Sequence, residues 1–202
     1  MELICVRHGR TAWNAGGRFQ GHTDIPLDAE GRAQAAALGV LLRGEPFDRA
    51  VTSDLQRAEE TARIVLGDRD VALRRDPGWR EMAFGAWEGL TWDEIVARNP
   101  QFDAGNETAV HVYRPEGGED FEALCARIGD AVVAVTAELP DDGTALIATH
   151  AGPLHALLRV LLGESDARAM KVRFLTASVT RFRRTAGVWH LAELNVTAEL
   201  AS

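Results

Sequence analysis

The chain has little that would cross-link it or carry it into a membrane. Its 202 residues include only two cysteines, Cys5 and Cys125, too few for a disulfide framework. Each lies in an apolar segment, where a free cysteine packs as a small buried hydrophobic residue. No run approaches the ~20 apolar residues of a membrane span, and no basic region followed by a long apolar core marks a signal peptide. We therefore expect a cytoplasmic protein without membrane contacts.

An excess of positive charge is also missing. Against 30 acidic residues there are 22 lysines and arginines, and the net charge is −8. This charge argues against nucleic acid or an anionic membrane as a partner, although a local cluster of arginines can still bind a small anion. The histidines lack the paired spacings of zinc motifs, and there is no Gly-Lys-Ser/Thr phosphate loop. The sequence therefore predicts neither a bound metal nor a cofactor.

Strand-like and helix-like segments alternate along the chain. Strands are expected at residues 3–6, 49–52, 71–73 and 144–149, with a final hairpin over 172–183 and 187–195. Helices are expected after Asp28, after Ser53, from near Thr91, over 121–139 and from Pro153. This alternation predicts a three-layer α/β/α sandwich with a mostly parallel sheet, formed by residues 1–202 as one domain. The catalytic groups of such folds gather at the carboxyl ends of the strands.

Several residues mark where the helices begin. Asp28 is expected to cap the helix that follows it, and Ser53 with Gln56 fits a capping box. Pro153 stands where a first helical residue is expected.

Residues 99–118 have no clear period, and we expect them to form a lid-like excursion over one face of the sheet.

A cation, an imidazole and a glycine end the first predicted strand. Arg7-His8-Gly9 is followed by Thr11 and Asn14, and the order Arg-His-Gly-x-Thr-x-x-Asn resembles the signature of the histidine phosphatase (phosphoglycerate mutase-like) superfamily. The resemblance implies a phosphoglycerate mutase-like fold and catalysis through a phosphorylated histidine. A neutral imidazole can attack phosphorus and hold the phosphoryl group, so His8 is the predicted nucleophile. Gly9 leaves room for the backbone to approach the phosphate.

The same resemblance implies a phosphate pocket built from separate segments. Arg7, Asn14, Arg57 and His150 match its binding positions, Arg57 through a Ser-x-x-x-Arg-x-x-x-Thr pattern that begins at Ser53. Phosphoryl transfer depends mostly on positioning and charge stabilisation, so a ring of donors is the main requirement.

Glu81 is the predicted general acid and base. It lies in Arg-Glu-x-x-Phe-Gly-x-Trp-Glu-Gly, which resembles the family loop that carries this carboxylate. The leaving oxygen needs a proton when the first bond breaks, and the attacking water must lose one in the second step. Glu88 is the alternative, although the family pattern implies a structural role for it. Gln20 and Gly21 match a family loop that borders the substrate and are predicted to bind it.

Three positions depart from the commonest family pattern. Arg10 stands where Glu or Gln is frequent, and we expect it to add positive charge near the pocket. Ala151 replaces the glycine that usually follows the second histidine, which would restrict the backbone beside the phosphate. Asp120 replaces a serine and is expected to cap the next helix. None of these changes removes a catalytic group.

These residues favour a phosphomonoester hydrolase that acts on a small phosphorylated metabolite. The first alternative is a cofactor-dependent phosphoglycerate mutase, which uses the same pocket but returns the phosphoryl group to a substrate hydroxyl. Mutases of this family tend to have a longer middle excursion. The second alternative is a non-catalytic phosphate sensor, which predicts loss of His8 or Glu81, and both are present. The natural substrate and the oligomeric state stay open at this level.

Overall fold

The computed structural model describes residues 1–99, 102, 114–165, 169 and 171–198. Within them a central sheet has the strand order β3-β2-β4-β1-β5-β6. The strands are β1 (Glu2–Arg7), β2 (Arg49–Thr52), β3 (Leu73–Arg75), β4 (Thr144–Thr149), β5 (Ser178–Thr185) and β6 (Val188–Thr197). β1 to β4 run parallel, whereas β5 and β6 add an antiparallel hairpin at one edge. The sheet is therefore mostly parallel, as predicted.

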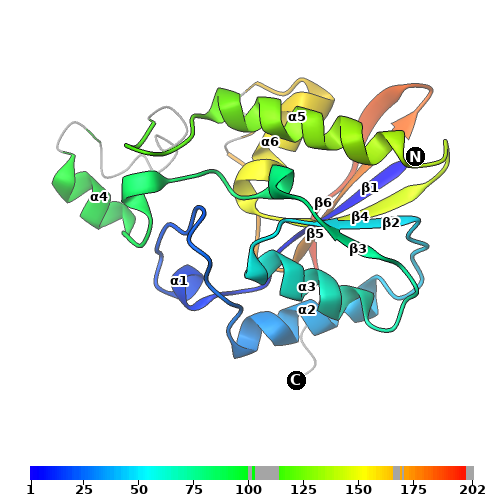
Figure 1. Ribbon diagram of the computed structural model, residues 1–202, viewed down its shortest axis with the longest axis horizontal. Coiled ribbons are helices and arrows are strands. Elements are labelled where there is room, and N and C mark those ends of the chain that lie inside the picture. The colour runs from blue at the N-terminus through cyan, green and yellow to red at the C-terminus, as the bar shows by residue number, and fades with distance from the viewer. Residues whose placement is uncertain (100–101, 103–113, 166–168, 170, 199–202) are drawn as a thin grey trace.

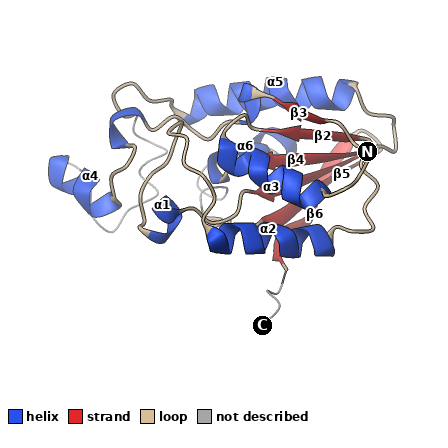
Figure 2. Ribbon diagram, turned by 60° about the horizontal axis from the view of Figure 1, so that its bottom comes forward, coloured by secondary structure: helices blue, strands red, loops and turns tan. Residues whose placement is uncertain are grey.

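Helices cover both faces of this sheet (Figures 1 and 2). One face carries α2 (Ala29–Leu41) and α3 (Gln56–Leu66), and the other carries α5 (Phe121–Ala137) and α6 (Ala151–Leu162). In β1, Leu3 and Cys5 pack into the core under α5 and α6, whereas Ile4 and Val6 pack into the core under α2 and α3. Burial on both faces explains why this strand is apolar at consecutive positions. The predicted three-layer sandwich is confirmed.

Shorter elements lie beyond the carboxyl end of the sheet. They are α1 (Ala12–Ala15), α4 (Trp92–Arg98) and the 3-10 turns Pro77–Trp79 and Gly85–Trp87. α1 is a single turn within a polar loop and has no counterpart among the predicted helices. Most of the predicted excursion at 99–118 lies outside the described residues. No helix in the described part of the chain combines the length and the apolar character needed to cross a membrane.

Two predicted helix caps are confirmed. Asp28 Oδ1 accepts a hydrogen bond from the Gly31 N–H at 2.7 Å at the start of α2. Asp120 Oδ1 accepts one from the Ala123 N–H at 2.8 Å at the start of α5. Both side chains satisfy a helical donor that lacks an intrahelical partner.

Two other predicted helix starts are wrong. α3 begins at Gln56, and its N–H donates to Oδ1 of the distant Asp24 at 2.8 Å, so Ser53 and Gln56 form no capping box. α6 begins at Ala151, which makes Pro153 its third residue. Proline is tolerated there because the first four N–H groups of a helix have no intrahelical acceptor.

Two strand boundaries also differ from the prediction. β3 covers 73–75 and not 71–73, because Leu73 is the first residue of this segment that pairs with β2. β5 begins at Ser178 and not near 172. The hairpin turn falls at Ala186 and Gly187, with φ of 50° and 83°.

Candidate active site

The two predicted site histidines meet at the carboxyl end of the sheet. β1 and β4 are neighbours with Arg7 opposite Thr149, so the next residues, His8 and His150, emerge side by side. Their ring centroids lie 5.0 Å apart, and both residues are buried. β2 lies on the other side of β4, and α3 after it brings Arg57 to the same edge. The strand order thus assembles three segments that are distant in sequence.

His8 is held as a neutral imidazole with one nitrogen unused. Its Nδ1 lies 2.8 Å from the Gly9 carbonyl oxygen. Because that oxygen only accepts, Nδ1 carries the proton and Nε2 keeps its lone pair. Burial lowers the pKa of His8 well below its usual value, and the positive charges of Arg57 and Arg7 lower it further. The ring can therefore act as a nucleophile at neutral pH.

The backbone after His8 is tightly enclosed. The Gly9 N–H donates to Thr61 Oγ1 at 3.0 Å. A Cβ at Gly9 would lie 2.3 Å from the Gly31 carbonyl oxygen, so only glycine fits here. Thr61 is the last residue of the Ser-x-x-x-Arg-x-x-x-Thr pattern, and its contact with Gly9 joins α3 to the end of β1.

His150 takes the opposite tautomer. Its Nδ1 accepts a hydrogen bond from Arg57 Nε at 3.2 Å, which places the proton of the neutral ring on Nε2. This Nε2 is buried and has no hydrogen-bond partner among the described residues. Burial, Arg57 and then His8 lower the pKa of His150 well below its usual value. The neutral ring offers one free N–H to a bound anion.

Two arginines, the buried Arg57 and the partly buried Arg7, supply the positive charge. Arg57 donates from Nη2 to the Gly21 carbonyl at 2.7 Å and from Nη1 to the Thr23 carbonyl at 2.9 Å. Burial lowers the pKa of Arg57 to about 10, so it remains a cation at neutral pH. Arg7 Nη1 donates to the Phe174 carbonyl at 2.5 Å, and its buried Nε has no hydrogen-bond partner among the described residues. Neither arginine forms an ion pair with a carboxylate in the described part of the chain.

Glu81 lies beside these cations with one carboxylate oxygen anchored. Its Oε1 accepts from the N–H groups of Met82 at 2.8 Å and of Gly152 at 2.9 Å. No hydrogen bond among the described residues reaches Oε2. When Glu81 is ionised, its negative charge raises the pKa values of both Arg7 and Arg57 against the effect of burial. Glu81 thus lies beside Arg7 and Arg57, with Oε1 bound and Oε2 without a hydrogen bond among the described residues.

Glu88, the alternative acid, is fully engaged elsewhere. Its Oε1 accepts from the N–H groups of His22 at 2.9 Å and Phe84 at 3.1 Å. Its Oε2 accepts from the N–H and Oγ1 of Thr23, at 2.9 and 2.5 Å. Three of these bonds join Glu88 to residues 22–23 and the fourth joins it to Phe84, which supports the structural role over the catalytic one.

The remaining predicted site residues, Asn14, Gln20 and Gly21, lie between His8 and α2 in the chain, and the Gly21 carbonyl contacts Arg57. Asn14 Oδ1 accepts from the Thr11 N–H at 3.1 Å, which completes the capping box of α1. Gln20 is buried, and its Oε1 has no hydrogen-bond partner among the described residues. The Gly21 backbone has a φ of 53°, and a Cβ there would lie 2.1 Å from Glu88 Oε1. Both the positive φ and this clash favour glycine at position 21, and the Gly21 carbonyl accepts from Arg57 Nη2 at 2.7 Å.

The positive charge expected from Arg10 is neutralised. Arg10 forms ion pairs with Asp28, at 2.7 Å, and with Glu30. That expectation is therefore wrong, because both carboxylates lie at the start of α2 beside the arginine. Ala151 is the first residue of α6, a position where alanine adopts the helical backbone without strain.

The contact between Gly152 and Glu81 was not predicted from the sequence. Its N–H binds Glu81, and a Cβ there would lie 2.3 Å from Glu81 Oε1. The available signal was a glycine in the first turn of a helix, where the N–H groups are unpaired and bind negative charge.

This chain is similar to known phosphatases and phosphoglycerate mutases over most of its length. Residues 3–197 match the model of the histidine phosphatase superfamily, branch 1. An adenosylcobalamin/alpha-ribazole phosphatase of Salmonella typhimurium is 34% identical over 96% of this chain and 91% of its own length. A 2,3-bisphosphoglycerate-dependent phosphoglycerate mutase of Mesorhizobium japonicum is 33% identical over 99% and 95%.

Solved structures show the same likeness. A mycobacterial glucosyl-3-phosphoglycerate phosphatase is 30% identical, covers 97% of this chain and 99% of its own, and superposes with a TM-score of 0.87. The predicted family, the phosphoglycerate mutase-like fold and the assignment as a phosphatase-type enzyme are confirmed. The chain belongs to branch 1 of the histidine phosphatase superfamily.

Proposed function

We propose that this enzyme hydrolyses phosphate monoesters of small metabolites through a phosphohistidine at Nε2 of His8. The observation that carries the proposal is the charge around that ring. Arg57 is fully buried and Arg7 is partly buried with a buried Nε, neither forms an ion pair with a carboxylate among the described residues, and His8 beside them is neutral. Buried charges are costly unless paired, and a phosphate group would supply the missing negative charge.

The first step transfers the phosphoryl group to His8. Its Nε2 lone pair attacks phosphorus while the bond to the leaving oxygen breaks, and protonated Glu81 donates its proton to that oxygen. Arg7 and Arg57 stabilise the charge on the equatorial oxygens, and the Nε2–H of His150 adds a donor. Asn14, Gln20 and Gly21 border the bound substrate.

The second step releases phosphate. Glu81, now a carboxylate, takes a proton from a water molecule, and the water oxygen attacks the phosphorus of phospho-His8. The P–N bond breaks, its electron pair returns to Nε2, and inorganic phosphate leaves. Glu81 ends the cycle protonated and His8 neutral, so both are ready for another substrate.

A phosphoglycerate mutase is the second candidate, because a relative with 33% identity carries that name. It shares the first step and differs only in the acceptor, a substrate hydroxyl in place of water. Within the phosphatase proposal, the names of two relatives give the first substrates to test: α-ribazole phosphate and glucosyl-3-phosphoglycerate.

Rapid quench with a radiolabelled phosphomonoester tests the proposal. We expect label on wild-type protein that is lost to water within the catalytic cycle, and neither label nor turnover in a folded His8→Ala variant. Wild-type activity in that variant would reject His8 as the nucleophile. A phosphoenzyme that survives in water for many turnover times but discharges at once to 3-phosphoglycerate would identify a mutase. Phosphate binding without turnover of any phosphomonoester would identify a sensor.

A further inference from the structure

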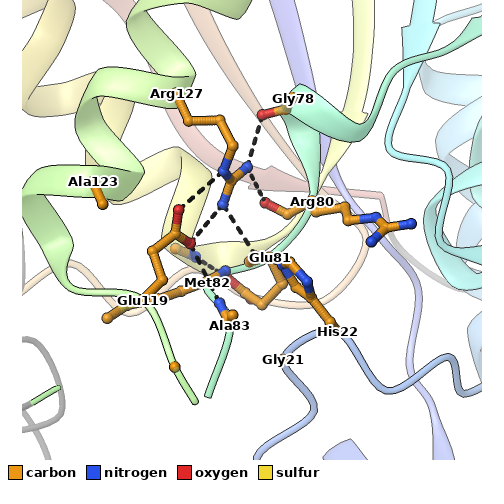
Figure 3. Close-up of polar contacts among 12 residues, drawn as sticks. Gly21, His22, Gly78, Arg80, Glu81, Met82, Ala83, Glu119, Ala123 and Arg127 are labelled. Atoms are coloured by element: carbon orange, nitrogen blue, oxygen red, sulfur yellow. Dashed lines mark hydrogen bonds and ion pairs between the residues drawn. The ribbon is translucent and has the colours of Figure 1, made fainter. Parts of the chain in front are cut away.

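An ion pair between Arg127 and Glu119 lies next to the backbone of Glu81 and joins α5 to the residues just before this helix. Arg127 lies on α5, and Glu119 immediately precedes the Asp120 cap. Arg127 Nε lies 3.0 Å from Glu119 Oε1, and Nη2 lies 2.7 Å from Oε2 (Figure 3). The side chains of Arg127 and Glu119 are only 24% and 15% exposed. This forked, charge-assisted pair is therefore largely shielded from water, which strengthens it.

The rest of the Arg127 guanidinium binds the backbone around Glu81. Nη1 donates to the carbonyl oxygens of Gly78, at 2.8 Å, and Arg80, at 3.0 Å, and Nη2 donates to that of Glu81 at 3.3 Å (Figure 3). One side chain thus holds three carbonyls of the segment 78–83, which we term the Glu81 loop.

Glu119 binds the other end of the Glu81 loop. Its Oε2 accepts from the Ala83 N–H at 3.3 Å, and its own N–H donates to the Ala83 carbonyl at 2.9 Å. Arg127 and Glu119 therefore hold the backbone on both sides of Glu81. The opposite charges of Arg127 and Glu119 compensate each other, so the pair influences the Glu81 loop by holding its backbone in place.

The Glu81 loop needs such support. Residues 80–84 belong to no helix or strand, so no regular hydrogen-bond ladder fixes the backbone that carries Glu81. On the opposite side, His22 Nε2 lies 2.9 Å from the Glu81 carbonyl oxygen. A catalytic group works only when held close to its productive position, and a misplacement of about 1 Å can cost ~10²-fold in rate.

We propose that Arg127 and Glu119 are positioning residues that fix the carboxyl group of Glu81 for proton transfer by clamping the Glu81 loop. This inference rests on the proposed role of Glu81 as general acid. Neither residue contacts the substrate in this scheme, because all of their contacts described above are to each other and to the backbone of the loop.

The test compares two leaving groups in Arg127→Met. An alkyl phosphate needs protonation of its leaving oxygen, whereas p-nitrophenyl phosphate needs little. We expect kcat/KM for the alkyl ester to fall by about 10- to 100-fold, and that for the aryl ester by about threefold or less. Adding Arg127→Met to Glu81→Gln should change either substrate little further, because its effect operates through Glu81.

A matched control separates positioning from general stability. Arg181 is also a largely buried arginine, with ion pairs to Glu2 at 2.8 Å and Glu45 at 2.9 Å, but it contacts no part of the Glu81 loop. Arg181→Met should lower the melting temperature and leave the ratio of alkyl to aryl activity unchanged. If Arg127→Met fails to fold, Glu119→Gln decides, because it keeps the side-chain volume and one acceptor. It should show the same alkyl-selective loss, only smaller.

The outcomes separate this inference from the proposed function. Equal losses on both esters in a folded Arg127→Met or Glu119→Gln, or a full additional loss in the Glu81→Gln background, would overturn the positioning role. Absence of any alkyl-selective loss in Glu81→Gln itself would instead reject Glu81 as the acid, and with it the basis of the inference.

Discussion

Replacing Gly152 with alanine should disable Glu81 while the fold persists. Gly152 donates its N–H to Glu81 Oε1 at 2.9 Å from the first turn of α6. A Cβ at this position would lie 2.3 Å from that oxygen, whereas ordinary contact begins at 3.4 Å. The carboxyl group of Glu81 must therefore move by about 1 Å, a displacement on the scale that impairs catalysis.

The structure gives the expected size of the loss in activity and of the change in stability. A displacement of about 1 Å predicts a loss of ~10²-fold in kcat/KM, equivalent to ~2.7 kcal/mol of transition-state stabilisation. The lost hydrogen bond to a carboxylate costs about 1.5–3 kcal/mol of stability, and the better helix propensity of alanine offsets up to ~1 kcal/mol of that cost. The variant should therefore stay folded and fail in catalysis.

Steady-state kinetics with an alkyl phosphate and thermal unfolding measure the two effects. Gly129→Ala is the matched control, since it makes the same change within α5, and its Cβ would meet only Val160 Cγ1 at 3.9 Å. We expect Gly129→Ala to keep full activity and to gain up to ~1 kcal/mol of stability. A Gly152→Ala variant whose kcat/KM stays within about threefold of wild type would refute the reasoning, because proton transfer would then not depend on where Gly152 holds Glu81.

Three further predictions follow from burial and charge. Burial holds the pKa values of His8 and His150 well below that of a free histidine. The unfolded chain therefore takes up more protons than the folded one below pH ~6.5. As the pH is lowered below this value, the free energy of unfolding should decrease by up to ~1.4 kcal/mol per pH unit for each histidine. Urea titrations at several pH values check this, and a flat profile would contradict it. Arg57→Lys loses the forked donors, so kcat/KM should fall by roughly 10³-fold and inorganic phosphate should no longer raise the melting temperature; unchanged protection by phosphate would place the anion elsewhere. Glu88→Gln turns an amide donor toward N–H groups, so we expect a loss of about 2 kcal/mol of stability with the ratio of alkyl to aryl activity intact, whereas an altered ratio would favour Glu88 as the acid.

Much of this protein follows from the sequence because the causes are local. A strand buried on both faces is apolar at consecutive positions, as residues 3–6 and 145–148 are. The caps Asp28 and Asp120 act on N–H groups three residues away. The placement of His8 and His150 also follows, because residues after parallel strands emerge at the same edge of a sheet.

Other features depend on contacts between distant segments, which only the tertiary structure decided. α3 is capped by Asp24, 32 residues before Gln56, so the local Ser53 signal was misleading. Glu81 is anchored by Gly152 across 71 residues. Glu88 is set apart from Glu81 by four hydrogen bonds, from His22, Thr23 and Phe84, that form in the folded chain. A carboxylate becomes a catalytic or a structural group according to which donors surround it, and those donors meet only after the strands have found their order.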